Sequence, residues 1–305
     1  MTASMTSRVA GAPPAWLAWL PVLLGLAVLY LPTWWDLAHG LWLADEQAHG
    51  PLILLVSLYL AWQQRAAFAA DSDVPSPAAA GHTRPVLGWG VLLFGLLAYA
   101  LGRSQEILLF EVGSQIPVLF GVLLITLGGP AVRRLWFPVL FLAFMVPLPG
   151  FVVDGLTGPL KQFVSAAASN ILHGVGYPVA RSGVILTIGA YQLLVADACS
   201  GLHSIFSLSA LGLLYMHLMR HTGVLRNALL LASIVPIAVA ANVVRVILLI
   251  LITYHFGDAA GQGFAHDFTG MVLFMVGLLA MMGFDVLLGA VAFRNRPRSE
   301  SGSTR

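Results

Sequence analysis

The sequence predicts an all-α, polytopic integral membrane protein with about eight transmembrane helices and a short hairpin outside them. Hydrophobic residues make up 59% of the 305-residue chain and charged residues only 9%, and the mean hydropathy is +0.88. A soluble domain carries far more charge on its surface. The net charge of +2 is too small to indicate nucleic-acid binding, so the lipid bilayer is the predicted surrounding and no nucleic acid is a predicted partner.

Eight apolar runs account for the predicted spans, because each is long enough to approach the width of a hydrocarbon core of roughly 30 Å. They lie near residues 15–34, 49–63, 86–102, 113–130, 135–150, 201–219, 226–254 and 267–292. The second and fifth runs are short, so tilted, broken or re-entrant forms remain open for them. The first run has no small-residue cleavage site behind it, and we expect an uncleaved anchor rather than a signal peptide.

The sequence predicts one transmembrane domain over residues 1–292, which includes a linker, and a tail that follows the domain. Residues 66–85 contain Pro75, Pro77, Gly81 and Pro85 among small and polar residues, which predicts a cytoplasmic linker without a core of its own. Residues 293–305 predict a basic, disordered cytoplasmic tail.

Residues 151–198 form the longest predicted outer loop, which contains an expected interfacial helix. Apolar residues recur there at helical spacing opposite a polar set. The apolar set is Leu156, Leu160, Phe163, Ala167 and Ile171, and the polar set is Lys161, Gln162, Ser165 and Ser169. Further on, residues 183–195 are rich in Val, Ile and Leu around Gly189, which predicts a short hairpin.

Basic residues predict an N-in, C-in orientation. With both termini in the cytoplasm, 11 of the 15 Lys and Arg residues fall on the inner side, as the positive-inside rule requires. The inner set is Arg8, Arg65, Arg84, Arg133, Arg134, Arg220, Arg226, Arg294, Arg296, Arg298 and Arg305. Only Arg103, Lys161, Arg181 and Arg245 lie outside or within the bilayer.

Three residues able to support acyl transfer fall near the outer side of this arrangement. Cys199 is the only cysteine, so it makes no internal disulfide and is either an inert buried thiol or a reactive one. His266 immediately precedes the eighth predicted span. Arg245 lies inside the seventh, where insertion scales assign an arginine a cost of about 2.5 to 3.5 kcal/mol. Such a residue is retained for a partner or for function.

Neighbouring polar residues supply supporting candidates. Asn242 shares a helix face with Arg245. His203 lies four positions after Cys199 and is a second candidate base, while His49 lies on the same outer side as a candidate substrate contact. Each also has a structural interpretation, since a lone cysteine usually packs and a histidine beside an aspartate is often a capping neighbour. The histidines and Cys199 lack compact zinc-motif spacing, and neither a metal nor another cofactor is predicted.

Two acidic residues near predicted helices are interpreted as structural. Glu111 and Asp285 are single acids in apolar surroundings, and we expect them to be paired or to face a cavity rather than to act in catalysis.

Several short motifs, in order, resemble the exosortases, integral-membrane transpeptidases of the exosortase/archaeosortase superfamily. The motifs are Ala198-Cys199-Ser200-Gly201-Leu202, Asn242-Val243-Val244-Arg245, His266-Asp267, His49-Gly50-Pro51-Leu52, Val146-Pro147-Leu148-Pro149 and Gly174-Val175-Gly176-Tyr177-Pro178-Val179. The resemblance covers roughly residues 30–285. The region around His49-Gly50-Pro51, which follows Asp45-Glu46-Gln47, is most similar to the subgroup called exosortase B.

The resemblance implies a catalytic set of Cys199, Arg245 and His266 at the outer face of a bacterial inner membrane. It further implies that the partners are secreted proteins with a C-terminal sorting signal of the PEP-CTERM kind, which combines a Pro-Glu-Pro-like motif, a transmembrane helix and a basic tail. Many family members have arginine where this chain has His203, so the role of that position is in doubt.

Residue chemistry fits the same reaction. A Cys199 thiolate can attack a peptide carbonyl, His266 can act as base and then as acid, and Arg245 can stabilise an oxyanion or clamp the substrate. A transporter or channel component, with Arg245 and Asn242 lining its pathway, is the alternative. The lack of repeat symmetry and a polar cluster near one face rather than the midplane argue against it. A non-enzymatic scaffold is a third class, which no residue specifically favours.

Reporter fusions test the predicted orientation. We expect periplasmic signals from reporters fused after His49, in the loop holding Lys161 and at His266, because the arginine distribution is consistent with that orientation alone. A cytoplasmic signal from the Lys161 loop would overturn both this orientation and the secreted-substrate hypothesis.

Overall fold

The computed structural model describes residues 17, 19–44, 47–65, 85–194, 202–219, 223–257, 260 and 264–294. For residues 156, 202–205, 264–267 and 291–294 it describes the backbone only. Most of the predicted linker, the end of the chain after residue 294, and Cys199 lie outside the described residues. The chain divides into two compact units, residues 1–147 and 148–305, and each is described by itself.

The described part is a polytopic helical membrane fold. Five helices are long and apolar enough to cross a membrane, or six if Gly128–Met145 and Gly150–Gly174 together form one broken span. The predicted number of eight is not confirmed. The helix predicted near residues 49–63 exists, but as a shorter apolar helix, Gly50–Gln63, and Phe206–Met219 is another.

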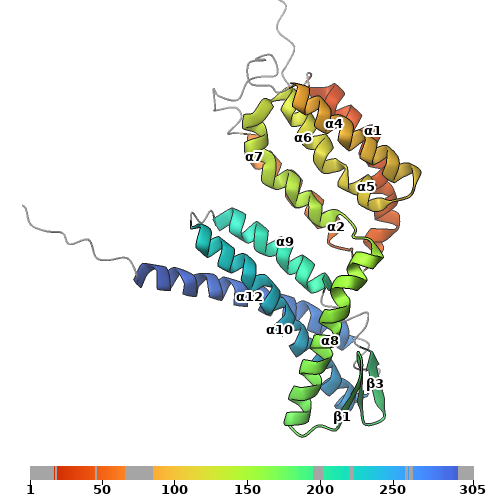
Figure 1. Ribbon diagram of the computed structural model, residues 1–305, viewed down its shortest axis with the longest axis vertical. Coiled ribbons are helices and arrows are strands. Elements are labelled where there is room, and N and C mark those ends of the chain that lie inside the picture. The colour runs from red at the N-terminus through yellow and green to blue at the C-terminus, as the bar shows by residue number, and fades with distance from the viewer. Residues whose placement is uncertain are drawn as a thin grey trace, which may run out of the picture. The chain divides into compact units, whose positions relative to one another are not determined.

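The first unit is a bundle of helices (Figure 1). Its elements are α1 (Leu20–His39), η2 (Leu41–Leu43), α2 (Gly50–Gln63), α4 (Pro85–Ser104), α5 (Leu108–Gly113), α6 (Gln115–Thr126), α7 (Gly128–Phe141) and η4 (Leu142–Met145). The span predicted at residues 113–130 begins earlier and is divided at Ser114 between α5 and α6.

Glycines allow α4 and α6 to pack closely. Gly88, Gly95 and Gly102 recur every seven residues and are buried along α4. A Cβ atom on Gly95 would lie 2.8 Å from the Val118 backbone nitrogen, and one on Gly121 of α6 would lie 2.7 Å from the Leu92 nitrogen. Neither glycine can gain a side chain without moving a backbone, which is how small residues bring membrane helices together.

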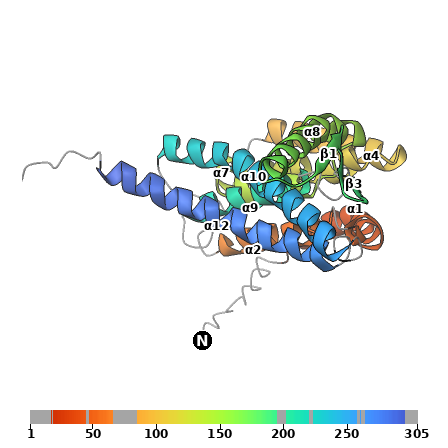
Figure 2. The same ribbon diagram turned by 90° about the horizontal axis from the view of Figure 1, so that it is seen from below.

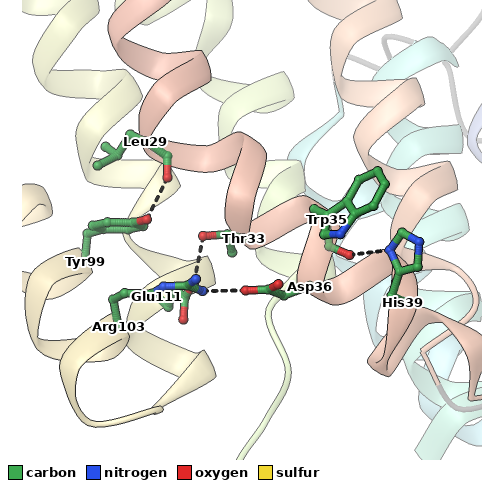
Figure 3. Close-up of polar contacts among 8 residues, drawn as sticks. All are labelled: Leu29, Thr33, Trp35, Asp36, His39, Tyr99, Arg103 and Glu111. Atoms are coloured by element: carbon green, nitrogen blue, oxygen red, sulfur yellow. Dashed lines mark hydrogen bonds and ion pairs between the residues drawn. The ribbon is translucent and has the colours of Figure 1, made fainter.

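A polar cluster joins α1, α4 and α5 (Figure 3). Arg103 donates to Asp36 at 2.7 Å and to Glu111 at 2.9 Å, and Thr33 donates to the same Glu111 oxygen at 2.7 Å. Glu111 is buried, at 3% exposure. The Arg103 side chain is 45% exposed, so its bond to Glu111 matters chiefly because it gives a buried carboxylate a partner, whereas the contact with the half-exposed Asp36 contributes little. The prediction that Glu111 is paired is confirmed.

The second unit combines helices with one small sheet. Its elements are α8 (Gly150–Gly174), β1 (Val179–Ser182), β2 (Ile185–Ile188), β3 (Tyr191–Leu194), α9 (Leu202–Met219), α10 (Val224–Phe256) and α12 (Phe264–Arg294). Figure 2 shows α12 lying along α10, with α9 beside them, in agreement with the contacts among these three helices.

The Gly174-Val175-Gly176-Tyr177 motif ends α8 and directs the chain into the sheet. Gly176 has a φ of 95°, a left-handed conformation that favours glycine. The Tyr177 nitrogen donates to the Leu172 carbonyl and the Gly176 nitrogen to the His173 carbonyl, both at 3.0 Å. This pair of bonds is a Schellman cap. Tyr177 then packs edge-on against Tyr254 of α10, with 5.8 Å between ring centroids.

The predicted hairpin is one strand larger than expected. β1, β2 and β3 form an antiparallel sheet in that order. Each connection has two residues and begins with a glycine at positive φ, Gly183 at 63° and Gly189 at 58°, which suits tight hairpin turns. The additional strand is β1, which lies before Gly183 and therefore outside the predicted range of residues 183–195.

The helix predicted in the outer loop is present, but its buried face is not the predicted one. Ser165 and Ser169 are buried, whereas Phe163 is 59% and Ile171 49% exposed. The core of α8 consists of Val164, Ala168 and Leu172, which pack with β2 and with Val243, Val246, Leu249 and Ile250 of α10. Serine fits this core because it is small and its hydroxyl is satisfied locally: Ser165 donates to the Lys161 carbonyl at 2.7 Å.

A second charged cluster holds α9, α10 and α12. Arg226 Nε donates to Asp285 Oδ1 at 2.7 Å, and the Tyr215 hydroxyl donates to Asp285 Oδ2 at 2.8 Å. Arg226 also donates to the Asp285 carbonyl at 3.0 Å. The carboxylate is 3% exposed and has a partner for each oxygen, so the prediction that Asp285 is paired is confirmed as well.

Candidate active site

The predicted catalytic residues fall in the second unit. Arg245 and Asn242 lie on α10 and are described in full. His266 and His203 belong to α12 and α9, where the structure describes their backbone positions. Cys199 precedes α9 and lies outside the described residues, so its predicted contact with the other residues stays a prediction.

Arg245 and Asn242 line a small cavity between α9, α10 and α12. The cavity has a volume of about 20 Å³ and is otherwise lined by apolar and glycine residues, among them Leu208 and Gly270. This is room for about one water molecule. Asn242 is 3% exposed, and its position three residues before Arg245 places both on one face of α10. The predicted shared face is therefore confirmed.

The guanidinium of Arg245 lies against the backbone of Gly270 in α12. A Cβ atom on Gly270 would lie 3.3 Å from one terminal nitrogen of Arg245 and 3.4 Å from Cζ. Such a contact is tighter than most side chains accept, so glycine allows the arginine to approach the helix closely. The arrangement places a planar cation, with its forked set of donors, between two helices.

Position 266 lies on the Gly270 side of α12. It precedes Gly270 by four residues, so the two share a helix face about one turn apart. Position 203 differs. It precedes Leu208, the α9 residue that lines the cavity, by five residues, which is a rotation of about 140° around the helix at 3.6 residues per turn. Position 266 thus shares a face of α12 with Gly270, which contacts Arg245, whereas position 203 does not share a face of α9 with Leu208.

His49 has a role within the first unit. Its Nε2 atom lies 3.2 Å from the Phe144 carbonyl oxygen, which joins the start of α2 to η4. A Cβ atom on the adjacent Gly50 would lie 2.7 Å from Cδ1 of Trp42, so a side chain at this position would require the Trp42 ring to move. These contacts account structurally for part of the His49-Gly50-Pro51-Leu52 motif, and substrate contact by His49 stays a prediction.

Gly270 is not among the predicted site residues. The available signal was its spacing: a glycine one helical turn after a predicted catalytic histidine, on a helix expected to pack beside an intramembrane arginine. Among the residues that the structure describes, no three His, Cys, Asp or Glu side chains gather in a group suited to a metal ion.

Comparison with known proteins identifies the family. The model of the transmembrane exosortase family (Exosortase_EpsH) matches residues 34–283. Searches of curated proteins and of solved structures found no match. The matched range includes α10 with Arg245, the start of α12 and the segment that holds Cys199, while the exosortase B subgroup stays a prediction. Because this range covers most of the 305 residues, the chain belongs to the transmembrane exosortase family.

Proposed function

We propose that this protein is a membrane cysteine transpeptidase that cleaves C-terminal sorting signals of the PEP-CTERM type from secreted proteins. The observation that carries the proposal is the Arg245 guanidinium, held against Gly270 one helical turn from position 266 in a chain of the exosortase family. We place the reaction at the outer face of a bacterial inner membrane, since the substrates are secreted and the arginine distribution favours that side.

The first half-reaction forms a thioester on Cys199. His266 accepts the thiol proton, and the thiolate attacks the carbonyl carbon of the scissile peptide bond. The tetrahedral intermediate collapses as the C–N bond breaks. His266 returns the proton to the departing amine, which leaves with the transmembrane helix and basic tail of the sorting signal.

The second half-reaction releases the secreted protein. An acceptor amine or water attacks the thioester carbonyl as His266 accepts a proton from it, and the C–S bond then breaks as His266 returns that proton to the Cys199 sulfur, which regenerates the thiol. A histidine suits both steps because its ordinary pKa lies near neutrality.

Arg245 stabilises the charge that develops on the carbonyl oxygen. Its guanidinium presents several donors in one plane, and the partly buried setting between α10 and α12 strengthens its interaction with an oxyanion relative to bulk water. Asn242, on the same face of α10, is proposed as a substrate-contact residue that hydrogen-bonds the peptide backbone.

Replacement of the proposed nucleophile tests the function itself. In cells that express a secreted protein with a PEP-CTERM signal, we expect Cys199→Ala to abolish the shift to the processed form on a gel, because no other side chain supplies the thiol. Ser209→Ala on α9 is the matched control and should process normally. Unchanged processing by Cys199→Ala, at equal protein levels in the membrane, would eliminate the enzyme hypothesis.

A conservative change at Arg245 tests the role of its planar fork. We expect Arg245→Lys to lose roughly 100-fold to 1,000-fold in processing rate, the range for removal of an oxyanion donor, because lysine is a point charge that cannot hold an oxygen through two donors. Arg181→Lys in β1, whose exposed side chain bonds the Gly183 carbonyl, is the control and should stay active. Near-normal turnover of Arg245→Lys would show that Arg245 contributes only a positive electrostatic field and not a planar pair of hydrogen-bond donors.

The two histidines can be distinguished by substitution. We expect His266→Ala to abolish processing, with a loss of about 100-fold to 10,000-fold typical of a missing general base. His203→Ala and His203→Arg should retain much of the activity, because position 203 lies about 140° around the axis of α9 from Leu208, which lines the Arg245 cavity. Rates measured at matched membrane levels decide between them, and the opposite ranking would assign the base to His203.

A further inference from the structure

The small sheet of the second unit has an unpaired edge. Its strand order is β1-β2-β3, so β1 pairs with β2 on one side, and no strand among the described residues pairs with its other side. This other side is called the free edge below. Ala180, Arg181 and Ser182, three of the four residues of β1, are exposed. A row of unpaired backbone N–H and C=O groups is a template on which another extended segment can pair.

The register of the hairpin decides which groups of β1 point to the free edge. A two-residue loop joins Ser182 to Ile185, and these two residues close the ladder as a hydrogen-bonded pair. Bonded and non-bonded positions alternate along antiparallel strands, so the N–H and C=O of Arg181 point away from β2. Val179 has the same phase, and its N–H donates to the Tyr177 carbonyl at 2.9 Å instead of to β2. The free edge therefore offers one complete pair of a backbone donor and a backbone acceptor, at Arg181.

Arg181 also brings a positive charge to the free edge. Its guanidinium donates to the Gly183 carbonyl at 3.0 Å, which holds the side chain beside the hairpin turn and uses one of the several N–H donors of the group. Opposite charges that face each other directly across neighbouring strands attract. A carboxylate opposite Arg181 on an added strand would therefore form a cross-strand ion pair.

The sheet lies beside the outer end of α10. In the predicted orientation, a hydrocarbon core of about 30 Å takes about 20 residues of helix from Arg226 on the inner side, and it ends at about residue 246. The contacts of the sheet on α10 include Leu249, Ile250 and Tyr254, which lie beyond that residue. An open strand edge is excluded from lipid because its backbone groups need partners. The free edge therefore belongs on the outer, aqueous side, where a secreted substrate is available.

A Pro-Glu-Pro segment matches the free edge in spacing and in charge. Neighbouring residues of a strand point their backbone groups to opposite sides, so when the glutamate faces Arg181, both proline nitrogens face away from the sheet. Proline is tolerated in that place, on an edge strand with its nitrogen toward solvent. The glutamate carboxylate then lies on the same face as the Arg181 side chain and opposite to it.

We propose that the free edge of β1 binds the Pro-Glu-Pro-like motif of the substrate as a fourth, antiparallel strand. The motif's glutamate exchanges two backbone hydrogen bonds with Arg181 and pairs with its guanidinium. This inference rests on the proposed function and adds the place where the motif is recognised. The sheet packs on Val246, the residue after Arg245 in α10, so the bound motif lies across one helix from the proposed catalytic site.

Exchange of charge between enzyme and substrate tests the ion pair. Purified full-length enzyme in nanodiscs is assayed with a complete sorting signal that carries Pro-Glu-Pro. We expect Arg181→Glu to raise KM about threefold to tenfold, because two like charges then face each other, and to leave kcat unchanged, because the edge does not touch the reacting carbonyl. A Pro-Arg-Pro substrate should restore KM for this variant and raise it for the wild type.

Two enzyme variants control for other effects of charge. Gln192→Glu adds a negative charge at an exposed position of β3, the strand at the other side of the sheet, and should leave KM unchanged. Arg181→Lys keeps the positive charge and the backbone groups and should process at the normal rate. If wild-type enzyme cleaves the signal but Arg181→Glu has a normal KM, or Pro-Arg-Pro gives no rescue, the docking site is wrong and the peptidase proposal stands. A wild type that does not cleave the signal rejects both.

The backbone pairing is tested on the substrate, so that folding of the enzyme is not at stake. A semisynthetic signal with an N-methyl group on the motif's glutamate cannot donate to the Arg181 carbonyl, and its KM should rise about fivefold, the effect of one hydrogen bond. The control carries the N-methyl group on the third residue before the glutamate, whose nitrogen would face away from the sheet. Equal effects of the two N-methyl groups would reject strand addition.

A second copy of the chain is the competing occupant of the free edge. Since only Arg181 offers a complete backbone pair, pairing of β1 with β1 of another copy would place two arginines opposite each other, which is unfavourable. Mass photometry of the nanodisc sample checks this. Arg181→Pro removes the outward N–H and keeps the ladder to β2. A wild-type dimer that this variant converts to a monomer would assign the edge to a second copy and overturn the proposal, whereas a monomer, or a dimer that persists, supports a free edge.

Discussion

Both units depend on the requirement that a charge in an apolar setting must have a partner. A single unpaired charge at the centre of a membrane helix is costly enough to compromise insertion, and the two buried acids meet this requirement in the same way. Glu111 accepts from Arg103 and Thr33, and Asp285 accepts from Arg226 and Tyr215. Each cluster joins three helices, so the satisfaction of one carboxylate also determines how its neighbours are arranged. The ion pairs are positional constraints more than sources of net stability.

Glycine serves two different purposes in these bundles. Between α4 and α6, Gly95 and Gly121 let backbones approach to distances that a Cβ atom would forbid, and the gain is the dispersion energy of close packing. In α12, Gly270 makes room for a functional group, because the Arg245 guanidinium lies where a side chain would crowd it. The first use is common in membrane helices. The second use, at Gly270, is found at the surface where we propose that the substrate carbonyl reacts.

The core of the second unit explains why Arg245 is held where it is. One face of α10 packs against α8 and β2 through Val243, Val246 and Ile250. The last turn of α10 is held by the contact of its Tyr254 with Tyr177, which follows the capped end of α8. With that face buried, the face that carries Asn242 and Arg245 is turned toward α9 and α12. Preorganisation of this kind lets a cation stabilise developing charge without a reorganisation cost at the moment of reaction. This arrangement also agrees with the proposal that the base, His266, is supplied by a separate helix, α12.

The sequence by itself determined the class of fold and the approximate positions of the helices, because a backbone in lipid must satisfy its own hydrogen bonds and only long apolar runs do so as helices. It also supplied the candidate site residues except Gly270. It also predicted that Glu111 and Asp285 are either paired or face a cavity. The tertiary structure decided which partners these are, since Arg226 and Asp285 are 59 residues apart in the chain. It likewise decided which face of α8 is buried, placing Ser165 inside and Phe163 outside. Periodicity could not make that choice, because the outside of a membrane protein is as apolar as its core.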